Sequence, residues 1–386
     1  MHKGGLIPPF LVPREPPRRQ RRGGHRAGIA IDVKHRSQRF SECRLYFWHS
    51  AIAVTRSMQS SSELFPVALI SAELRGDLSE DVYLLKPNNS PDCTVELALT
   101  RLGLAGAEGE RGVPVVLLHG SFSNRRFWYS PKGIGLGAYL ARAGFDVWIA
   151  EMRGHGLSPR NESYRSNNVA QYVRYDLPAV ADFIFEQSGQ AAHWIGHSLG
   201  GVILAAALGG GFLDESRARS AALFGSQISR IYWPLKLPPV EWGARLLLRA
   251  FPYLSGRRLK RGPEDEPIGL AQETLRWLGL FGRFGDREQD WWTGLTQVRL
   301  PILAVGAVAD HQDPAWACRK LLEQCSAAST QFLLLGKSNG FSSDFGHIEM
   351  LVSKEAQREV WPLTEYWLQH LQLPAGFSEE AASVGG

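Results

Sequence analysis

Residues 194–201 have the sequence WIGHSLGG, and the elements on either side of this stretch determine the fold class. A short apolar run, residues 191–195, leads into it, and an apolar segment with helical spacing, residues 199–208, follows. A chain that turns directly from a strand into a helix strains the central residue, so glycine is needed where side chains would collide. The pattern therefore predicts a buried strand, a sharp turn centred on Ser198 and a buried helix.

The same alternation of short apolar runs and helical patterns extends along most of the chain. Runs that are bounded by Gly or Pro and rich in branched residues indicate buried parallel strands. The predicted strands are Val113–His119, Phe145–Ala150, Ala191–Ile195 and Leu300–Val305. Helical spacing occurs between them, at Gly135–Ala143, Val169–Glu186 and Leu199–Leu208. This alternation predicts an α/β fold, a doubly wound, mostly parallel sheet with helices on both faces.

Residues 226–295 interrupt this alternation and predict a helical cap over the carboxyl edge of the sheet, where α/β folds place their sites. The block contains two helical patterns, near Val240–Leu254 and Ile268–Phe284, and the five tryptophans Trp233, Trp242, Trp277, Trp291 and Trp292. We therefore expect a lead-in over 58–81, an α/β domain over 82–372 that carries the cap, and a flexible tail over 373–386.

The formal net charge of +5 is unevenly distributed along the chain. Residues 1–57 carry 12 basic and 3 acidic side chains, whereas the remaining residues carry 31 basic and 35 acidic side chains. The basic segment is rich in Pro, Arg and Gly, and we expect it to be disordered, or not translated if the protein starts at Met58. This distribution does not support a nucleic-acid-binding surface on the body of the protein.

Two further features bear on location. Residues 194–212 approach the length of a membrane span, but His197, Ser198 and a glycine cluster interrupt them, so no transmembrane helix is predicted. Four sparse cysteines form no CxxC pair, which predicts free thiols in a reducing compartment, the cytoplasm, and no zinc site.

The sequence Gly196-His197-Ser198-Leu199-Gly200 matches G-x-S-x-G and predicts Ser198 as a nucleophile. A serine hydroxyl needs a base within hydrogen-bond reach and a carboxylate that orients the base. His347 precedes the terminal helical segment in a predicted loop and is the candidate base. Asp310 follows the last predicted strand and is the favoured carboxylate, and Asp313 is its rival, although it can instead cap the next helix.

Acyl-transfer chemistry also requires hydrogen-bond donors for the oxyanion. The backbone N–H of Leu199, which follows the nucleophile, is the first candidate. The second is expected from the loop after the first core strand, His119-Gly120-Ser121-Phe122, with Ser121 preferred and Phe122 next. His119 itself is expected to shape this loop rather than to ionise.

Together these motifs resemble the α/β-hydrolase superfamily, in its serine esterase and lipase branch. The resemblance covers residues 82–372 and rests on LLHG at 117–120, EMRGHGLS at 151–158, WIGHSLGG at 194–201, the Asp310 loop and GHIEML at 346–351. It implies ester hydrolysis through an acyl-enzyme on Ser198, with His347 as the base and Asp310 as the carboxylate that orients it. Glu151 departs from the Asp that relatives commonly have, and we expect little consequence. Acyltransferase, thioesterase or amidase chemistry with the same residues remains an alternative, as does a non-enzymatic binding protein on this fold.

The expected partner is a small-molecule ester, and the pattern implies no cofactor and no metal. If the aromatic cap is a lid, medium-chain or lipid-like acyl esters are the expected substrates; if its aromatics only pack, the cap carries no information on substrate. The sequence does not predict an oligomeric state.

Overall fold

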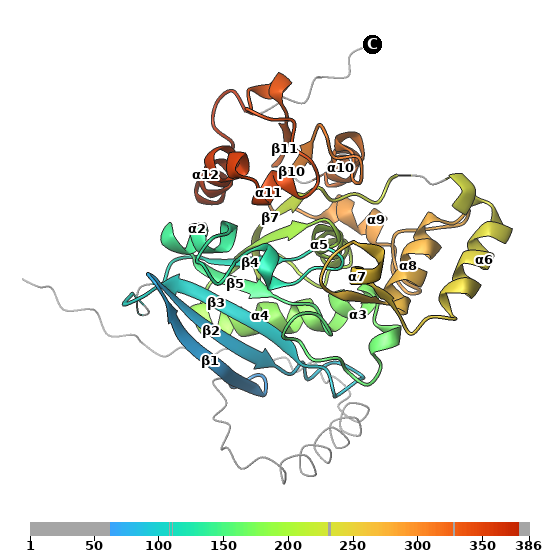
Figure 1. Ribbon diagram of the computed structural model, residues 1–386, viewed down its shortest axis with the longest axis horizontal. Helices are drawn as coiled ribbons and strands as arrows, with labels where there is room; N and C mark the ends of the chain where they lie inside the picture. Colours follow the sequence, from blue (N-terminus) through green and yellow to red (C-terminus); the bar gives the residue numbers. More distant parts are fainter. Residues whose placement is uncertain (1–61, 108, 110, 231–232, 327–328, 378–386) are drawn as a thin grey trace, which may run out of the picture. The chain divides into compact units, whose positions relative to one another are not determined.

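A computed structural model describes residues 62–107, 109, 111–230, 233–326 and 329–377 (Figure 1). The expectations for residues 1–57 lie outside these ranges, as does most of the predicted tail. The described chain contains a nine-stranded sheet in the order β1-β2-β3-β5-β4-β6-β7-β10-β11. Its strands are β1 (Val67–Arg75), β2 (Leu78–Leu85), β3 (Leu97–Leu104), β4 (Pro114–Leu118), β5 (Asp146–Ala150), β6 (Ala192–His197), β7 (Ala218–Phe224), β10 (Ile302–Ala307) and β11 (Thr330–Leu335).

The sheet is mostly parallel, and this confirms the predicted fold class. Strands β5, β4, β6, β7, β10 and β11 pair in parallel, whereas β1, β2 and β3 form an antiparallel meander that joins β5. The meander begins at Val67, so β1 and part of β2 lie in the segment that we expected to be a lead-in. The side chains of β1 are largely exposed, and its apolar residues therefore lack the regular alternation that identifies a buried strand.

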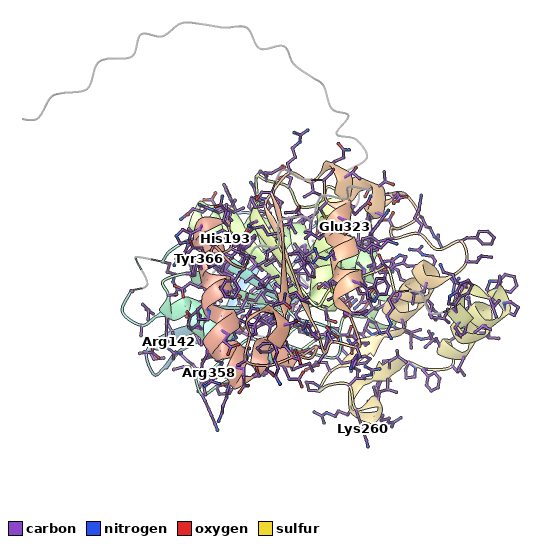
Figure 2. The ribbon with its side chains drawn as sticks, turned by 90° about the horizontal axis from the view of Figure 1, so that it is seen from above. Arg142, His193, Lys260, Glu323, Arg358 and Tyr366 are labelled. Carbon is purple, nitrogen blue, oxygen red and sulfur yellow. The ribbon has the colours of Figure 1, made fainter. Side chains whose placement is uncertain are left out.

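Helices cover both faces of the sheet and enclose two apolar cores. The first core lies under α4, α5 and α10, and the second lies under α2, α11 and α12. Helix α12, labelled at Arg358 and Tyr366 in Figure 2, and helix α10, labelled there at Glu323, belong to the two different cores and so cover opposite faces of the sheet. Outside the cap the helices are η2 (Arg125–Phe127), α2 (Leu136–Arg142), η3 (Tyr164–Ser166), α3 (Val169–Gln171), the π-turn η4 (Tyr172–Asp176), α4 (Leu177–Ser188), α5 (Leu199–Gly209), α10 (Ala315–Gln324), η7 (Lys337–Asn339), α11 (Glu349–Val352) and α12 (Lys354–His370).

The chain between β7 and β10 forms the helical insertion. It contains η5 (Trp233–Lys236), α6 (Pro238–Leu248), β8 (Tyr253–Ser255), α7 (Gly256–Leu259), β9 (Asp265–Pro267), α8 (Ile268–Leu278), α9 (Trp291–Gly294) and η6 (Leu295–Gln297). In Figure 1, α6 and α8 lie to one side of the sheet. The start of α7 lies against the loop after β4, because a Cβ on Gly256 would lie 3.0 Å from Cδ1 of Phe122. The two cap helices are shorter than the periodicity predicts, because Pro252 and Gly279 follow them closely and neither continues a helix well.

Among the helices of the described residues, none combines the length and the apolar character that a membrane span requires.

Candidate active site

Ser198 lies in a sharp turn between β6 and α5, as the sequence predicts. Its backbone has φ +53° and ψ −121°, a conformation that a residue with a side chain rarely adopts. A Cβ on Gly196 would lie 2.5 Å from the Cα of Gly201, and one on Gly200 would lie 2.4 Å from the carbonyl oxygen of Leu118. The glycines therefore let α5 pack directly against the ends of β4 and β6, which fixes Ser198 at the sheet edge.

Asp310 and His347 meet at the same edge of the sheet. Asp310 follows β10, and its Oδ2 lies 2.8 Å from Nδ1 of His347. Its other oxygen accepts hydrogen bonds from the backbone N–H groups of Gln312, at 2.9 Å, and Asp313, at 2.8 Å. The Asp310 carboxylate is buried and fully engaged, so it can hold the imidazole in one tautomer, with the proton on Nδ1.

Asp313 occupies the opposite side of the imidazole. The Ser198 hydroxyl donates to its Oδ2 at 3.4 Å, and this oxygen is 3.8 Å from Nε2 of His347. Nε2 itself accepts from the Gln312 amide nitrogen at 3.1 Å. Asp310 therefore contacts Nδ1 of the imidazole, whereas Asp313 contacts the Ser198 hydroxyl. A serine hydroxyl rotates freely, so the Ser198 proton is not confined to this acceptor.

The surroundings of Asp313 exclude the alternative that it caps a helix. The N-terminus of α10, at Pro314, has no side-chain cap. Instead, the Gln227 amide donates to Oδ1 of Asp313 at 2.9 Å. Burial raises the pKa of Asp313, and the hydrogen bond from Gln227 acts in the opposite direction.

The loop after β4 approaches Ser198 closely. A Cβ on Gly120 would lie 3.0 Å from Cβ of Ser198. The buried His119 ring donates from Nδ1 to the Gly120 carbonyl at 2.9 Å and accepts the Met152 N–H at Nε2, at 3.2 Å. Burial lowers the pKa of His119 to about 3, so the ring is neutral and holds the loop. This agrees with the role predicted for His119.

Of the two donors considered on this loop, Phe122 is engaged elsewhere. Phe122 has φ +58°, and its N–H donates to Oε1 of the buried Glu266 at 2.5 Å. The Phe122 N–H is therefore directed into the cap, which favours Ser121 over Phe122 as the partner of Leu199 in an oxyanion site.

The cap segment β8-α7-β9 thus holds the loop through two glutamates. The Glu264 N–H donates to the Phe122 carbonyl at 3.1 Å, and the Asn124 amide donates to the Glu264 carboxylate at 2.5 Å. Oε2 of Glu266 lies 3.3 Å from Nε2 of the buried His155. Burial opposes protonation of His155, but the Glu266 carboxylate outweighs it and raises the His155 pKa. Sequence reasoning missed Glu264 and Glu266, because they are 140 or more residues away from the loop residues that they contact.

Glu151 supports the same loop from the body of the protein. Its carboxylate accepts the Arg125 N–H at 2.9 Å and the Leu157 N–H at 3.0 Å. Glu151 therefore ties the loop after β4 to the turn after β5, a role that the sequence did not suggest.

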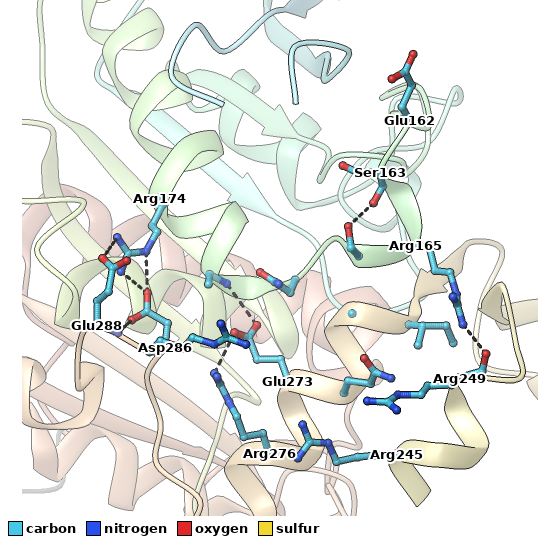
Figure 3. Close-up of a pocket in the computed structure, with 17 residues that line it drawn as sticks. Glu162, Ser163, Arg165, Arg174, Arg245, Arg249, Glu273, Arg276, Asp286 and Glu288 are labelled. Atoms are coloured by element: carbon cyan, nitrogen blue, oxygen red, sulfur yellow. Dashed lines mark hydrogen bonds and ion pairs between the residues drawn. The ribbon is translucent and has the colours of Figure 1, made fainter. Parts of the chain in front are cut away.

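A separate cleft of about 770 Å³ lies between η3, α3 and the cap helices α6 and α8 (Figure 3). Ion pairs cross it, among them Arg174 with Asp286 and Glu288. The Glu273 carboxylate accepts the N–H groups of Val169, at 2.7 Å, and Ala170, at 3.3 Å. Ser198, Asp310 and His347 do not line this cleft, and most of the residues that do line it are charged or polar.

The sheet topology and the strained serine turn define an α/β-hydrolase fold. The model of the alpha/beta hydrolase family matches residues 115–338, which is more than half of the chain. The chain therefore belongs to this family.

Individual relatives match this chain over a shorter segment than the family model does. The chain is 32% identical to triacylglycerol lipase 2 of Arabidopsis thaliana over 155 residues, 38% of this chain and 35% of that protein. It is 35% identical to human gastric triacylglycerol lipase over 136 residues, 33% of this chain and 32% of that protein. The match thus spans about a third of the length of these relatives.

Solved structures support the fold. An esterase from Thermogutta terrifontis aligns with a TM-score of 0.51 at 17% identity, over 75% of this chain and 98% of that one. A monoacylglycerol lipase from Paleococcus ferrophilus aligns with a TM-score of 0.50 at 18% identity, over 72% of this chain and 100% of that one.

Proposed function

We propose that this protein is a carboxylic ester hydrolase that acts through an acyl-enzyme on Ser198. The observation that carries the proposal is the strained Ser198 turn at the same sheet edge as the 2.8 Å contact between Asp310 and His347. A nucleophile, a base and an orienting carboxylate in this chain order match the arrangement of serine hydrolases on this fold. The lipase relatives support the same reaction class.

In this mechanism Ser198 Oγ attacks the ester carbonyl and His347 Nε2 takes its proton. The oxyanion is stabilised by the backbone N–H groups of Ser121 and Leu199, at the N-terminus of α5. The bond from carbon to the alcohol oxygen then breaks, and His347 returns the proton to that oxygen. Water, deprotonated by His347, releases the acid and restores Ser198.

We further propose an apolar acyl chain as the substrate's acid part. Only some of the cap's aromatic side chains support this proposal. Trp291 is buried in the core, and Trp277 and Trp292 pack against it, so these three serve packing. Trp233 and Trp242 remain exposed and supply apolar surface on the cap. A series of p-nitrophenyl esters of increasing acyl length tests this proposal, and a rate that is highest for acetate contradicts it.

The reaction itself is tested with a fluorophosphonate probe and with the variant Ser198→Ala. We expect a single adduct, at Ser198, and a loss of turnover of about 10⁴-fold to 10⁶-fold in Ser198→Ala. Ser216→Ala, at an exposed serine beyond α5, is the matched control and should retain both labelling and activity. An adduct at another residue of the folded protein, or full turnover by Ser198→Ala, overturns the proposal.

A further inference from the structure

The reaction centre contains a second carboxylate that the mechanism above does not use. Asp313 Oδ2 accepts the hydroxyl of Ser198 at 3.4 Å and lies 3.8 Å from Nε2 of His347. The Asp313 side chain is only 13% exposed. A charge in such a place interacts with whatever binds there more strongly than a charge on an open surface.

Asp313 is also fixed in place. The Gln227 amide holds Oδ1 at 2.9 Å, and the Asp313 backbone N–H donates to Asp310 at 2.8 Å. The carboxylate is therefore anchored both by the loop after β7 and by the loop after β10. These hydrogen bonds fix the position of the Asp313 carboxylate relative to Ser198.

The side of the imidazole on which Asp313 lies determines which part of a substrate it faces. His347 Nε2 returns its proton to the alcohol oxygen as the bond from carbon to oxygen breaks. A group 3.8 Å from Nε2 therefore lies beside the alcohol part of the ester. The oxyanion loop, with Ser121, approaches from the strand on the other side of Ser198, because β4 and β7 flank β6.

We propose that Asp313 determines specificity for the alcohol part of the ester, favouring a positively charged or hydroxyl-bearing alcohol and disfavouring an anionic one. This inference rests on the proposed ester hydrolysis and adds a substrate class to it. A cationic ammonium group on the alcohol is attracted by the Asp313 carboxylate, and a hydroxyl hydrogen gains an acceptor there, whereas a carboxylate or phosphate meets a like charge.

The test uses esters that share one acyl group and differ in the charge of the alcohol. Butyrylcholine is cationic, 3,3-dimethylbutyl butyrate is its neutral carbon isostere, and O-butyrylglycolate is anionic. All three form the same butyryl-enzyme, so differences in kcat/KM report only the step in which the alcohol is present. We expect the wild type to prefer the cationic over the neutral and the neutral over the anionic ester, by about tenfold or more at each step.

The variant Asp313→Asn keeps the size of the side chain and removes its charge. It should reduce the preference to less than about threefold at each step, chiefly by raising kcat/KM for the anionic ester and lowering it for the cationic one. Asp214→Asn is the matched control, because Asp214 is exposed and precedes β7 at the end of the strand remote from Ser198. It should leave the order and the size of the preference unchanged.

Two results overturn the inference. One is an equal effect of Asp313→Asn on all three esters, and the other is a wild type that does not distinguish them. The second result is independent of how well the variant folds. Failure of the proposed function is distinguishable, because then none of the three esters is turned over and the fluorophosphonate does not label Ser198.

Discussion

Helices α5 and α6 are both 11 residues long and both rich in apolar residues, yet they occupy opposite environments. Helix α5 follows Ser198 and is almost entirely buried, whereas α6 has no buried residue. On α6 the apolar side chains of Trp242, Leu246 and Leu247 are exposed, and the ion pair of Glu241 with Arg245, at 3.1 Å, is less exposed than they are. The body of the protein thus has a filled interior, and this part of the cap does not.

This difference shows which part of the cap is able to affect the reaction. The hydrogen bonds from the cap to the loop after β4 come from the segment β8-α7-β9, through Glu264 and Glu266, and not from α6. We therefore expect changes in α5 to affect stability and turnover, changes in β9 to affect turnover, and changes in α6 to affect neither strongly.

The largest effect is expected from Gly200→Ala in α5. The new methyl group would lie 2.4 Å from the carbonyl oxygen of Leu118 and 2.6 Å from that of His119. Because these are backbone atoms at the end of a central strand, they cannot move aside cheaply, and we expect a loss of about 3 kcal/mol in unfolding free energy. Urea unfolding monitored by circular dichroism measures it, and a loss below about 1 kcal/mol contradicts this account of the turn.

This turn is also the part of the molecule that the sequence predicts best. The strand, the glycines of the turn and the helix follow one another directly in the sequence, so the local pattern alone predicts the turn at Ser198. The order of Ser198, Asp310 and His347 follows from the same fold. Asp313 is different, because its distance from His347 Nε2 depends on how the loops after β7 and β10 pack together. Only the three-dimensional structure shows that Asp310 and Asp313 contact different sides of the imidazole.

The remaining differences have similar physical causes. Strand β7, ARSAALF, is rich in alanine, which favours strands weakly, so its sequence gives no clear strand signal. The sequence does not predict the antiparallel meander, because β1 is exposed along most of its length and lacks the alternation of a buried strand. Glu266 is a single charged residue in an insertion, and nothing in its local sequence indicates that it is buried against Phe122.

The second prediction concerns Glu266→Ala. This variant removes the acceptor of the Phe122 N–H and the partner of His155, so the loop that carries Ser121 keeps only the support that Glu264 provides from the cap. We expect kcat to fall by about tenfold to 100-fold, with a small change in KM, because a misplaced oxyanion donor weakens the transition state more than substrate binding. Steady-state kinetics with a p-nitrophenyl ester measure both constants.

Two further variants separate positioning from general damage. Glu266→Gln keeps an oxygen that accepts the Phe122 N–H and should recover most of kcat. Asp265→Asn changes the neighbouring residue, which pairs with Arg160 near the surface at 2.7 Å, and should leave kcat unchanged. If Glu266→Gln is as slow as Glu266→Ala, the hydrogen bond to Phe122 is not the cause.

The third prediction concerns Glu273, which connects α8 of the cap to α3 of the body. Burial raises the pKa of Glu273 to about 7. A carboxyl group whose pKa is higher in the folded than in the unfolded protein stabilises the fold when protonated, and this contribution is lost as pH rises from about 4.5 to about 7. The variant Glu273→Gln should therefore gain stability relative to wild type, by about 2 kcal/mol between pH 5 and pH 8.

Thermal unfolding across this pH range tests the sign. Glu288→Gln is the matched control, because Glu288 is an exposed partner of Arg174 in the same cleft. Its stability should depend on pH in the same way as that of wild type. The body has the opposite dependence, because burial lowers the pKa of His193 to about 4 and that of His197 to about 3. These histidines destabilise the fold as pH falls below about 6.5, so the contribution of Glu273 is obtained from the difference between variant and wild type.

The smallest effect is expected from Gly243→Ala in the middle of α6. Beyond the backbone of α6 itself, no atom of the described residues lies within 4 Å of the new methyl group, in contrast to Gly200. Alanine also favours a helix over glycine by about 1 kcal/mol. Because α6 has no buried residue, this gain should appear as slower amide hydrogen exchange over residues 238–248, with little change in global unfolding or in kcat. Faster exchange or a loss of activity would mean that the outer face of α6 packs against something in solution. The contrast between the filled environment of α5 and the open environment of α6 would then not hold.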